Sequence, residues 1–201
     1  MKTAVIFHSS IGKHVDTSYL ARHLKCTFTK ESAFFIKRNE AADNPDENLE
    51  EKVDKCVTNE TDLIIIQVGS NEITNLDIQS RPLVTLHEVV TNNMKHLLDL
   101  AEYTANSHSC KVFISALPPR YDSTNHDPAG TRSMLTDLAN AVLTSNSMTL
   151  ENVHLIEHSD LKCSGKSRKD TFTGDGVHLT KRGTHILTTD FKNAPDIPGP
   201  D

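Results

Sequence analysis

The sequence has no run of about 18 consecutive apolar residues, which is the length that a helix needs to cross a membrane. Glycine and proline are also scarce, with 8 residues each among 201, and this excludes collagen-like and linker-like chains. The hydrophobic share of 36% and the charged share of 24% are typical of a globular protein. A chain of this length buries roughly 70% of the surface that its unfolded form exposes, so it needs neither a disulfide nor a metal to fold.

Cysteine is rare, and none of the four forms a CxxC pair: Cys26, Cys56, Cys110 and Cys163. The apolar stretch at the amino terminus is too short for a signal peptide, because it meets the polar His8-Ser9-Ser10 at once. A chain without an export signal is expected to keep its thiols reduced. The sequence therefore predicts a cytoplasmic protein without disulfides.

An excess of positive charge is missing as well. The chain carries 21 Lys and Arg against 27 Asp and Glu, which gives a net charge of -6 and a pI near 6.0. Binding to nucleic acid by bulk electrostatics needs a surplus of basic residues. Short basic stretches at 37–38, 166–169 and 181–182 are candidates for a local patch, although such stretches are more typical of a solvated surface. We expect RNA to bind only weakly.

Short apolar runs alternate along the chain with longer amphipathic ones. The apolar runs, rich in β-branched residues, predict strands at 5–7, 63–68, 112–117 and 153–156, with a weaker strand around 33–36. Apolar residues at three- and four-residue spacing predict helices at 15–25, 49–56, 83–105, 131–144 and about 180–191. Plausible residues for capping the helix starts are Asp16, Asp46 or Asn48, Asp127 and Thr180.

This alternation predicts an α/β protein, a doubly wound three-layer α/β/α sandwich around five parallel strands. We expect one domain over residues 1–191, followed by a disordered tail at 192–201 that contains three prolines. Ligands of such sheets bind beyond the carboxyl ends of the strands. The residues that follow the predicted strands therefore decide the function.

Polar residues at these strand ends are those that acyl transfer requires. Ser10 follows the first strand and Asn71 follows the third, while Asp175 and His178 share one loop before the last helix. Acyl transfer needs a nucleophile, a base, a group that orients the base, and donors for the oxyanion. If the first strand is central, its end neighbours that of the third strand, and Ser10 and Asn71 converge.

Three segments resemble the conserved blocks of the SGNH, or GDSL-type, hydrolases. Residues 5–15 are similar to the first block, whose hallmark is Gly-Asp-Ser after strand 1; residues 63–73 are similar to the Gly-x-Asn-Asp block; and residues 172–183 are similar to the final Asp-x-x-His block. The blocks occur in the family's order and span residues 4–190. Within the superfamily the chain most resembles compact invertebrate and transposon-encoded esterase domains, which have counterparts of the Ser-Ala-Leu-Pro-Pro-Arg-Tyr-Asp stretch at 115–122.

This resemblance implies a flavodoxin-like α/β/α fold and a serine esterase that acts on small acyl or acetyl esters without a metal or other cofactor. Ser10 would be the nucleophile, His178 the general base and then acid, and Asp175 the residue that holds the imidazole tautomer. The oxyanion would be bound by the Ser10 N–H and by Asn71 Nδ2, within the block that also contains Gly69. Additional candidates for the site are His8, Ser9 and Arg120.

The chain departs from the family pattern at three places. His8-Ser9 replaces Gly-Asp, Glu72 replaces the final Asp of the second quoted block, and no glycine occurs between Gly12 and Gly69. The family takes one oxyanion donor from a glycine in that interval, so stabilisation of the oxyanion should depend more heavily on Asn71.

Other interpretations of the same residues remain open. Asp175 could cap the last helix, Ser9 and Ser10 could be turn residues, and Asn71 could cap its own turn. Zinc could use His154 and His158 with Cys163, or His108 with Cys110, although a four-residue interval along a strand spans about 13 Å and does not converge. The whole domain could be a catalytically silent SGNH-like module that binds RNA or protein, as in the C-terminal domain of Oskar, or an assembly domain of a transposon or viral polyprotein.

Overall fold

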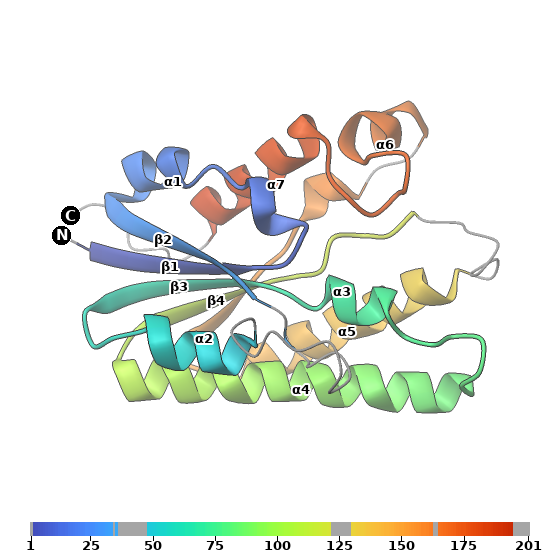
Figure 1. The fold of residues 1–201 in the computed structure, drawn as a ribbon, viewed down its shortest axis with the longest axis horizontal. Helices are drawn as coiled ribbons and strands as arrows, with labels where there is room; N and C mark the ends of the chain where they lie inside the picture. Colours follow the sequence, from blue (N-terminus) through green and yellow to red (C-terminus); the bar gives the residue numbers. More distant parts are fainter. Residues whose placement is uncertain (1, 34, 36–47, 122–129, 163–164, 195–201) are drawn as a thin grey trace.

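The computed structural model describes residues 2–33, 35, 48–121, 130–162 and 165–194 (Figure 1). Five parallel strands form one sheet in the order β2-β1-β3-β4-β5. They are β1 (Lys2–His8), β2 (Cys26–Ser32), β3 (Thr61–Gln67), β4 (Lys111–Ser115) and β5 (Val153–Ile156). The predicted five-stranded parallel sheet is confirmed, and β1 lies inside it between β2 and β3.

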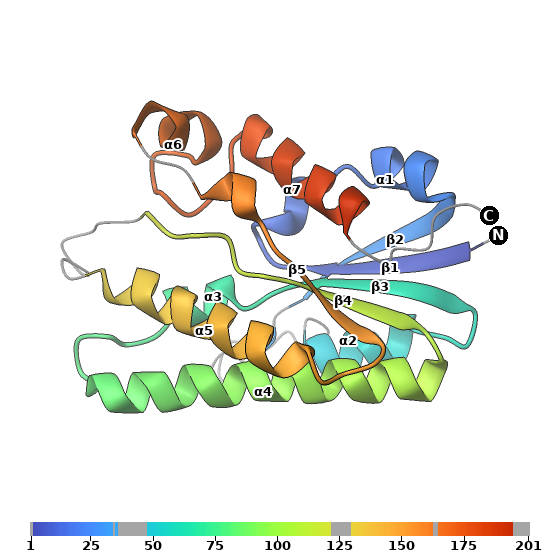
Figure 2. The ribbon, with the colours of Figure 1, turned by 180° about the vertical axis from the view of Figure 1, so that it is seen from behind.

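Helices cover both faces of the sheet (Figures 1 and 2). One face carries α1 (Thr17–Leu24) and α7 (Lys181–Asn193), and the other carries α2 (Leu49–Cys56), α4 (Leu83–His108) and α5 (Thr131–Ser147). Shorter helical segments lie in the connections: η1 (Gly12–His14), α3 (Ser70–Thr74), η3 (Ser159–Leu161) and α6 (Gly165–Thr171). Among the described residues no helix is both long enough and apolar enough to span a membrane.

Two hydrophobic cores result from the alternation of side chains along the strands. Ile64 and Ile66 of β3 face the core under α4, whereas Leu63 and Ile65 face the core under α1 and α7. All four side chains are buried, because this central strand is covered on both faces. The continuous apolar run that predicted β3 is therefore explained by burial on both sides.

The second strand lies at a different position from the one that the sequence predicts. The expected strand around 33–36 is instead β2 at Cys26–Ser32, and Ala33 and Phe35 follow it as buried residues. β2 pairs only with β1 among the described strands, and its residues alternate in exposure. An edge strand is partly solvated, so it lacks the apolar run by which strands were recognised.

Three predicted caps close the starts of their helices. Asp16 accepts a hydrogen bond from the Tyr19 N–H, Asn48 from the Glu50 N–H, and Thr180 from the Gly183 N–H. Asp46 and Asp127 lie outside the described residues. Residues 192 and 193 of the expected disordered tail are instead the last residues of α7, and the segment 195–201 lies outside the described residues.

Candidate active site

Three of the predicted site residues form one chain of hydrogen bonds at the carboxyl edge of the sheet. Ser10 follows β1 directly, and its Oγ lies 3.3 Å from His178 Nε2. His178 Nδ1 lies 2.6 Å from Asp175 Oδ2, in the loop that enters α7. All three side chains are exposed, so a substrate can reach the serine. The topology thus joins residues that are 168 positions apart in the sequence.

The loop that carries Asp175 and His178 is closed on itself. Phe172 and Leu179 pair as an antiparallel bridge, and within it the Thr173 N–H donates to the His178 oxygen at 2.8 Å. Asp175 Oδ1 accepts three hydrogen bonds, from Thr173 Oγ1, the Val177 N–H and the His178 N–H. Asp175 therefore holds its own loop together and is not the cap of α7, which is Thr180.

These hydrogen bonds keep Asp175 ionised. Its partial burial acts to raise the pKa of the carboxyl, but the hydrogen bonds from His178, Val177 and Thr173 outweigh burial and hold the pKa well below its usual range. A carboxylate can only accept, so the proton between the two residues lies on His178 Nδ1. Nε2 of the neutral ring is then free to accept the proton of Ser10.

Asn71 is the second side chain in contact with Ser10. The Ser10 hydroxyl donates to Asn71 Oδ1 at 3.2 Å, so the amide oxygen faces the serine where the sequence led us to expect Nδ2. Gly69, with φ of 103°, makes the left-handed turn between β3 and α3 that places Asn71 there. Residues with a side chain rarely adopt this φ, so the turn favours glycine at position 69.

Ser9 and His8 lie beneath the nucleophile and do not compete with it. Ser9 is buried, its N–H donates to the Gln67 oxygen at 2.8 Å, and its hydroxyl donates to Gln67 Oε1 at 3.2 Å. His8 is buried too, its Nδ1 lies 2.8 Å from the Ser9 oxygen, and burial lowers its pKa. A Cβ on Gly12 would lie 2.8 Å from both Gln67 Oε1 and His8 Cβ, so only glycine fits at that position.

Arg120 lies behind Asn71. It is buried, and its Nη1 donates to the Ser70 oxygen at 3.3 Å and to Thr74 Oγ1 at 2.9 Å. Both acceptors belong to α3, in which Asn71 is the second residue. Arg120 therefore supports the helix that presents Asn71.

Glu72 has a structural role as well. Its Oε1 accepts a hydrogen bond from the Phe35 N–H at 3.0 Å, which ties α3 to the segment after β2. Part of the interval between Gly12 and Gly69, residues 34 and 36–47, lies outside the described part of the chain. The expected lack of a donor there stays a prediction.

Two residues that the sequence analysis missed hold the catalytic loop from outside. The Tyr121 N–H donates to the Gly176 oxygen at 2.9 Å, and the Tyr121 ring meets Phe172 edge-on at 5.0 Å. Arg168 of α6 lies over the Tyr121 ring at 5.0 Å, and its Nη2 donates to the Tyr121 oxygen at 3.1 Å. Arg168 belongs to a basic stretch that we interpreted as solvated surface, so the sequence held no sign of this contact.

A second Ser–His–Asp arrangement lies inside the protein. His158 Nε2 is 2.8 Å from Ser115 Oγ, and His158 Nδ1 is 2.8 Å from Asp190 Oδ2. Ser115 is 1% exposed and His158 is 4% exposed, so no substrate reaches this serine. These contacts join the end of β4 to α7, and they are structural.

The same contacts bear on the zinc interpretation. Both ring nitrogens of His158 already have partners, while His154 lies against the Phe113 ring at 5.0 Å. His108 contacts Asn59, and Cys163 lies outside the described residues. Within the described ranges no group of three or more His, Cys, Asp or Glu could hold a metal ion.

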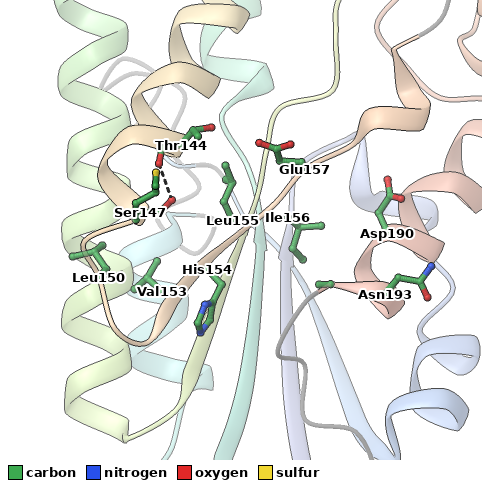
Figure 3. Close-up of a pocket in the computed structure, with 12 residues that line it drawn as sticks. Thr144, Ser147, Leu150, Val153, His154, Leu155, Ile156, Glu157, Asp190 and Asn193 are labelled. Atoms are coloured by element: carbon green, nitrogen blue, oxygen red, sulfur yellow. Dashed lines mark hydrogen bonds between the residues drawn. The ribbon is translucent and has the colours of Figure 1, made fainter.

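One cavity lies away from Ser10. It has a volume of about 580 Å³ and is bounded by β5 and by the carboxyl-terminal parts of α5 and α7 (Figure 3). Asp190 and Asn193 line it, so it lies at the opposite end of α7 from His178, roughly 18 Å along the helix axis. Its size alone does not make it the substrate site.

Residues 3–191 match the family model described as GDSL-like Lipase/Acylhydrolase. No curated protein matches the chain. Similar solved structures include a GDSL-like lipase from Bacteroides thetaiotaomicron, with 16% identity, coverage of 96% of this chain and 87% of that one, and a TM-score of 0.61.

Two further structures are similar at the same level. A putative platelet activating factor from Streptococcus pneumonia has 15% identity, covers 95% of this chain and 82% of its own, and has a TM-score of 0.67. Est24, a carbohydrate acetylesterase from Sinorhizobium meliloti, has 16% identity, covers 96% and 97%, and has a TM-score of 0.66. At such identities these structures show a shared fold.

Proposed function

Because the chain belongs to the family of GDSL-like lipases and acylhydrolases, we propose that it is a serine esterase of small acyl or acetyl esters that acts through Ser10, His178 and Asp175. The observation that carries this proposal is the exposed chain of hydrogen bonds from Ser10 Oγ to His178 Nε2 and from His178 Nδ1 to Asp175 Oδ2. An exposed serine with an oriented base is the arrangement that ester hydrolysis needs.

In the first half of the reaction, Ser10 Oγ attacks the ester carbonyl as His178 Nε2 takes the hydroxyl proton. The tetrahedral intermediate then collapses, the bond to the alcohol breaks, and His178 gives the proton to the departing alkoxide. In the second half, His178 takes a proton from water, the resulting hydroxide attacks the acyl-serine, and the acid leaves as Ser10 recovers its proton. Asp175 stabilises the imidazolium that forms in each half.

The oxyanion is bound by the Ser10 N–H and by Asn71. The Ser10 hydroxyl has one proton, so in the free protein it donates either to Asn71 Oδ1 or to His178 Nε2, and it turns to His178 before the proton transfer; Asn71 Oδ1 then has no donor at Ser10. A half-turn of the amide about χ2 then presents Nδ2 to the developing negative charge. The contact between Asn71 and Ser10 supports this role, because it places the amide beside the reacting oxygen.

Covalent labelling tests the proposal. A fluorophosphonate probe should add its mass to the wild-type protein and to the Ser115→Ala variant, but not to Ser10→Ala, and hydrolysis of p-nitrophenyl acetate should follow the same pattern. Ser115 is the matched control because it too lies beside a histidine, although it is buried. Labelling that persists in Ser10→Ala, or that is lost in Ser9→Ala alone, would show that the nucleophile is another residue.

The cytoplasmic location, and the kinship with invertebrate and transposon-encoded esterase domains, stay predictions of the sequence. The substrate proposed here is a small ester, and the reaction needs no metal or cofactor.

A further inference from the structure

Gln67, the last residue of β3, lies against the turn that carries Ser10. Its side chain is fully buried, and the residue is paired in register with His8, the last residue of β1. Both strands lie inside the sheet, with a neighbouring strand on each side (Figure 1). Side chains at this point of the sheet therefore offer a fixed base for the turn.

Gln67 contacts the turn on both sides of Ser10. The Ser9 N–H donates to the backbone oxygen of Gln67 at 2.8 Å, and the Ser9 hydroxyl donates to Gln67 Oε1 at 3.2 Å. On the other side, a Cβ on Gly12 would lie 2.8 Å from Gln67 Oε1, so the Gly12 backbone packs closely on the same amide. The exposed Ser10 is thus held between two residues that meet one buried side chain.

His8 holds the peptide that joins Ser9 to Ser10. His8 Nδ1 lies 2.8 Å from the Ser9 oxygen, and because a carbonyl oxygen only accepts, Nδ1 donates. A trans peptide is planar, and its N–H points away from its C=O. The hydrogen bond from His8 therefore also sets the direction of the Ser10 N–H, which is an oxyanion donor in the proposed reaction.

The contact between Ser10 and His178 leaves little room for movement of the turn. Ser10 Oγ lies 3.3 Å from His178 Nε2, at the upper end of the distance over which a base takes a proton directly. A shift of the Ser9–Ser10 peptide would lengthen this contact and turn the Ser10 N–H at the same time. Both effects would slow acyl transfer.

We propose that Gln67 and His8 are positioning residues of the esterase site, which together hold the Ser9–Ser10 peptide so that Ser10 Oγ meets His178 and the Ser10 N–H faces the oxyanion. The inference rests on the proposed esterase activity for its chemistry. Both side chains are buried and act on the substrate only through Ser10.

Two variants remove the two contacts separately. Gln67→Leu has no acceptor for the Ser9 hydroxyl, and His8→Phe keeps a buried ring without a donor for the Ser9 oxygen. Each should lower kcat for p-nitrophenyl acetate by about 10- to 100-fold, because a displacement of about 1 Å between reacting atoms can cost this much, while KM changes far less. Since both contacts act on one peptide, the double variant should lose less than the product of the two single losses.

The melting temperature separates positioning from a general loss of stability. Gln67→Leu leaves the Ser9 hydroxyl without its acceptor, but it also removes Nε2, which is buried without a hydrogen-bond partner among the described residues. These effects oppose each other, so the melting temperature should stay close to that of the wild type.

The matched control is Thr104→Val, which removes an equally buried hydroxyl that donates to the Leu100 oxygen within α4. This variant should keep the wild-type kcat. If Thr104→Val lowers kcat as much as Gln67→Leu does, the loss reflects packing in general and the positioning role is wrong.

A spectroscopic measurement keeps this inference distinct from the proposed activity. The ¹⁵N resonance of His178 Nε2 responds to its hydrogen bond with Ser10, and it should shift in Gln67→Leu and in His8→Phe but not in Thr104→Val. If it shifts in this pattern while the wild-type protein hydrolyses no ester, the positioning role is supported and the esterase proposal fails.

The opposite result is equally clear. If the Nε2 resonance and kcat both match the wild type in Gln67→Leu and His8→Phe, the two residues do not position Ser10, even where the wild-type protein is an esterase. Should one of the two variants not fold, the other decides the question, because each removes a different contact with the same peptide.

Discussion

Replacing Asp175 with asparagine tests the site more sharply than deleting the nucleophile does. Asp175 Oδ1 accepts hydrogen bonds from Thr173 Oγ1 and from the N–H groups of Val177 and His178, so the asparagine must keep its oxygen in that position. Its NH₂ group then faces His178 Nδ1, where Oδ2 now lies at 2.6 Å. An NH₂ group can only donate, so Nδ1 must lose its proton and Nε2 must carry it.

A ring protonated at Nε2 cannot accept the Ser10 proton. We therefore expect Asp175→Asn to lower kcat for p-nitrophenyl acetate by about 10⁴, the loss that follows from the wrong tautomer in the serine protease triad. KM should change little, because the substrate contacts neither oxygen of Asp175 before the proton moves. The loop should stay folded, since all three hydrogen bonds to Oδ1 are kept.

The matched control is Asp170→Asn, which neutralises an exposed carboxylate at the end of α6, outside the catalytic loop. It should keep the wild-type kcat, since it removes charge near the site without touching the tautomer. If Asp175→Asn keeps more than one tenth of the wild-type kcat, then Asp175 does not set the tautomer of His178 and the proposed triad is wrong.

Four further outcomes are expected. Asn71→Ala should lower kcat by about 10²–10³ with KM nearly unchanged, and full activity in a steady-state assay would exclude Asn71 from the oxyanion site. Arg168→Ala should lower kcat more than it changes KM, and Arg168→Lys, which keeps a cation over Tyr121, should recover part of the lost kcat. Equal kcat values for the two variants would show that the contact of Arg168 with Tyr121 does not affect catalysis. Burial lowers the pKa of His8, so as the pH falls the unfolded chain takes up a proton at this residue first, at about pH 6.5, and the free energy of unfolding decreases below that pH. Denaturant unfolding of His8→Gln should show a smaller decrease. Parallel plots of the free energy of unfolding against pH for the two proteins would refute this. RNA should bind no tighter than about 10⁻⁴–10⁻⁶ M at physiological salt, and submicromolar binding with a steep salt dependence would favour the RNA-binding interpretation.

The sheet could be predicted because burial leaves a mark on each central strand. β3 is covered on both faces and therefore carries an unbroken apolar run, and the caps at Asp16, Asn48 and Thr180 follow from the need to satisfy the first N–H groups of a helix. β2 could not be found in the same way, since an edge strand can carry Thr, Lys and Glu without loss.

The candidate site was predictable in its residues but not in its supports. Ser10, Asn71 and His178 fall at strand or helix ends, where parallel sheets gather functional groups. The contact of Arg168 with Tyr121 joins residues 47 positions apart and depends on how two side chains orient. No period or local motif encodes such a pairing, so only the folded structure shows it.

The bridge between Phe172 and Leu179 closes the loop between these two residues into a local unit. Asp175 and His178 both lie inside it, so a shift of α6 or α7 carries them together and changes the distance from His178 to Ser10 and the contacts of the loop with Tyr121. The base and its orienting carboxylate therefore lie together in a closed loop of eight residues, whereas the nucleophile follows a strand of the sheet. A protein engineer could tune activity by shifting this loop relative to the sheet while the hydrogen bond between His178 and Asp175 is kept.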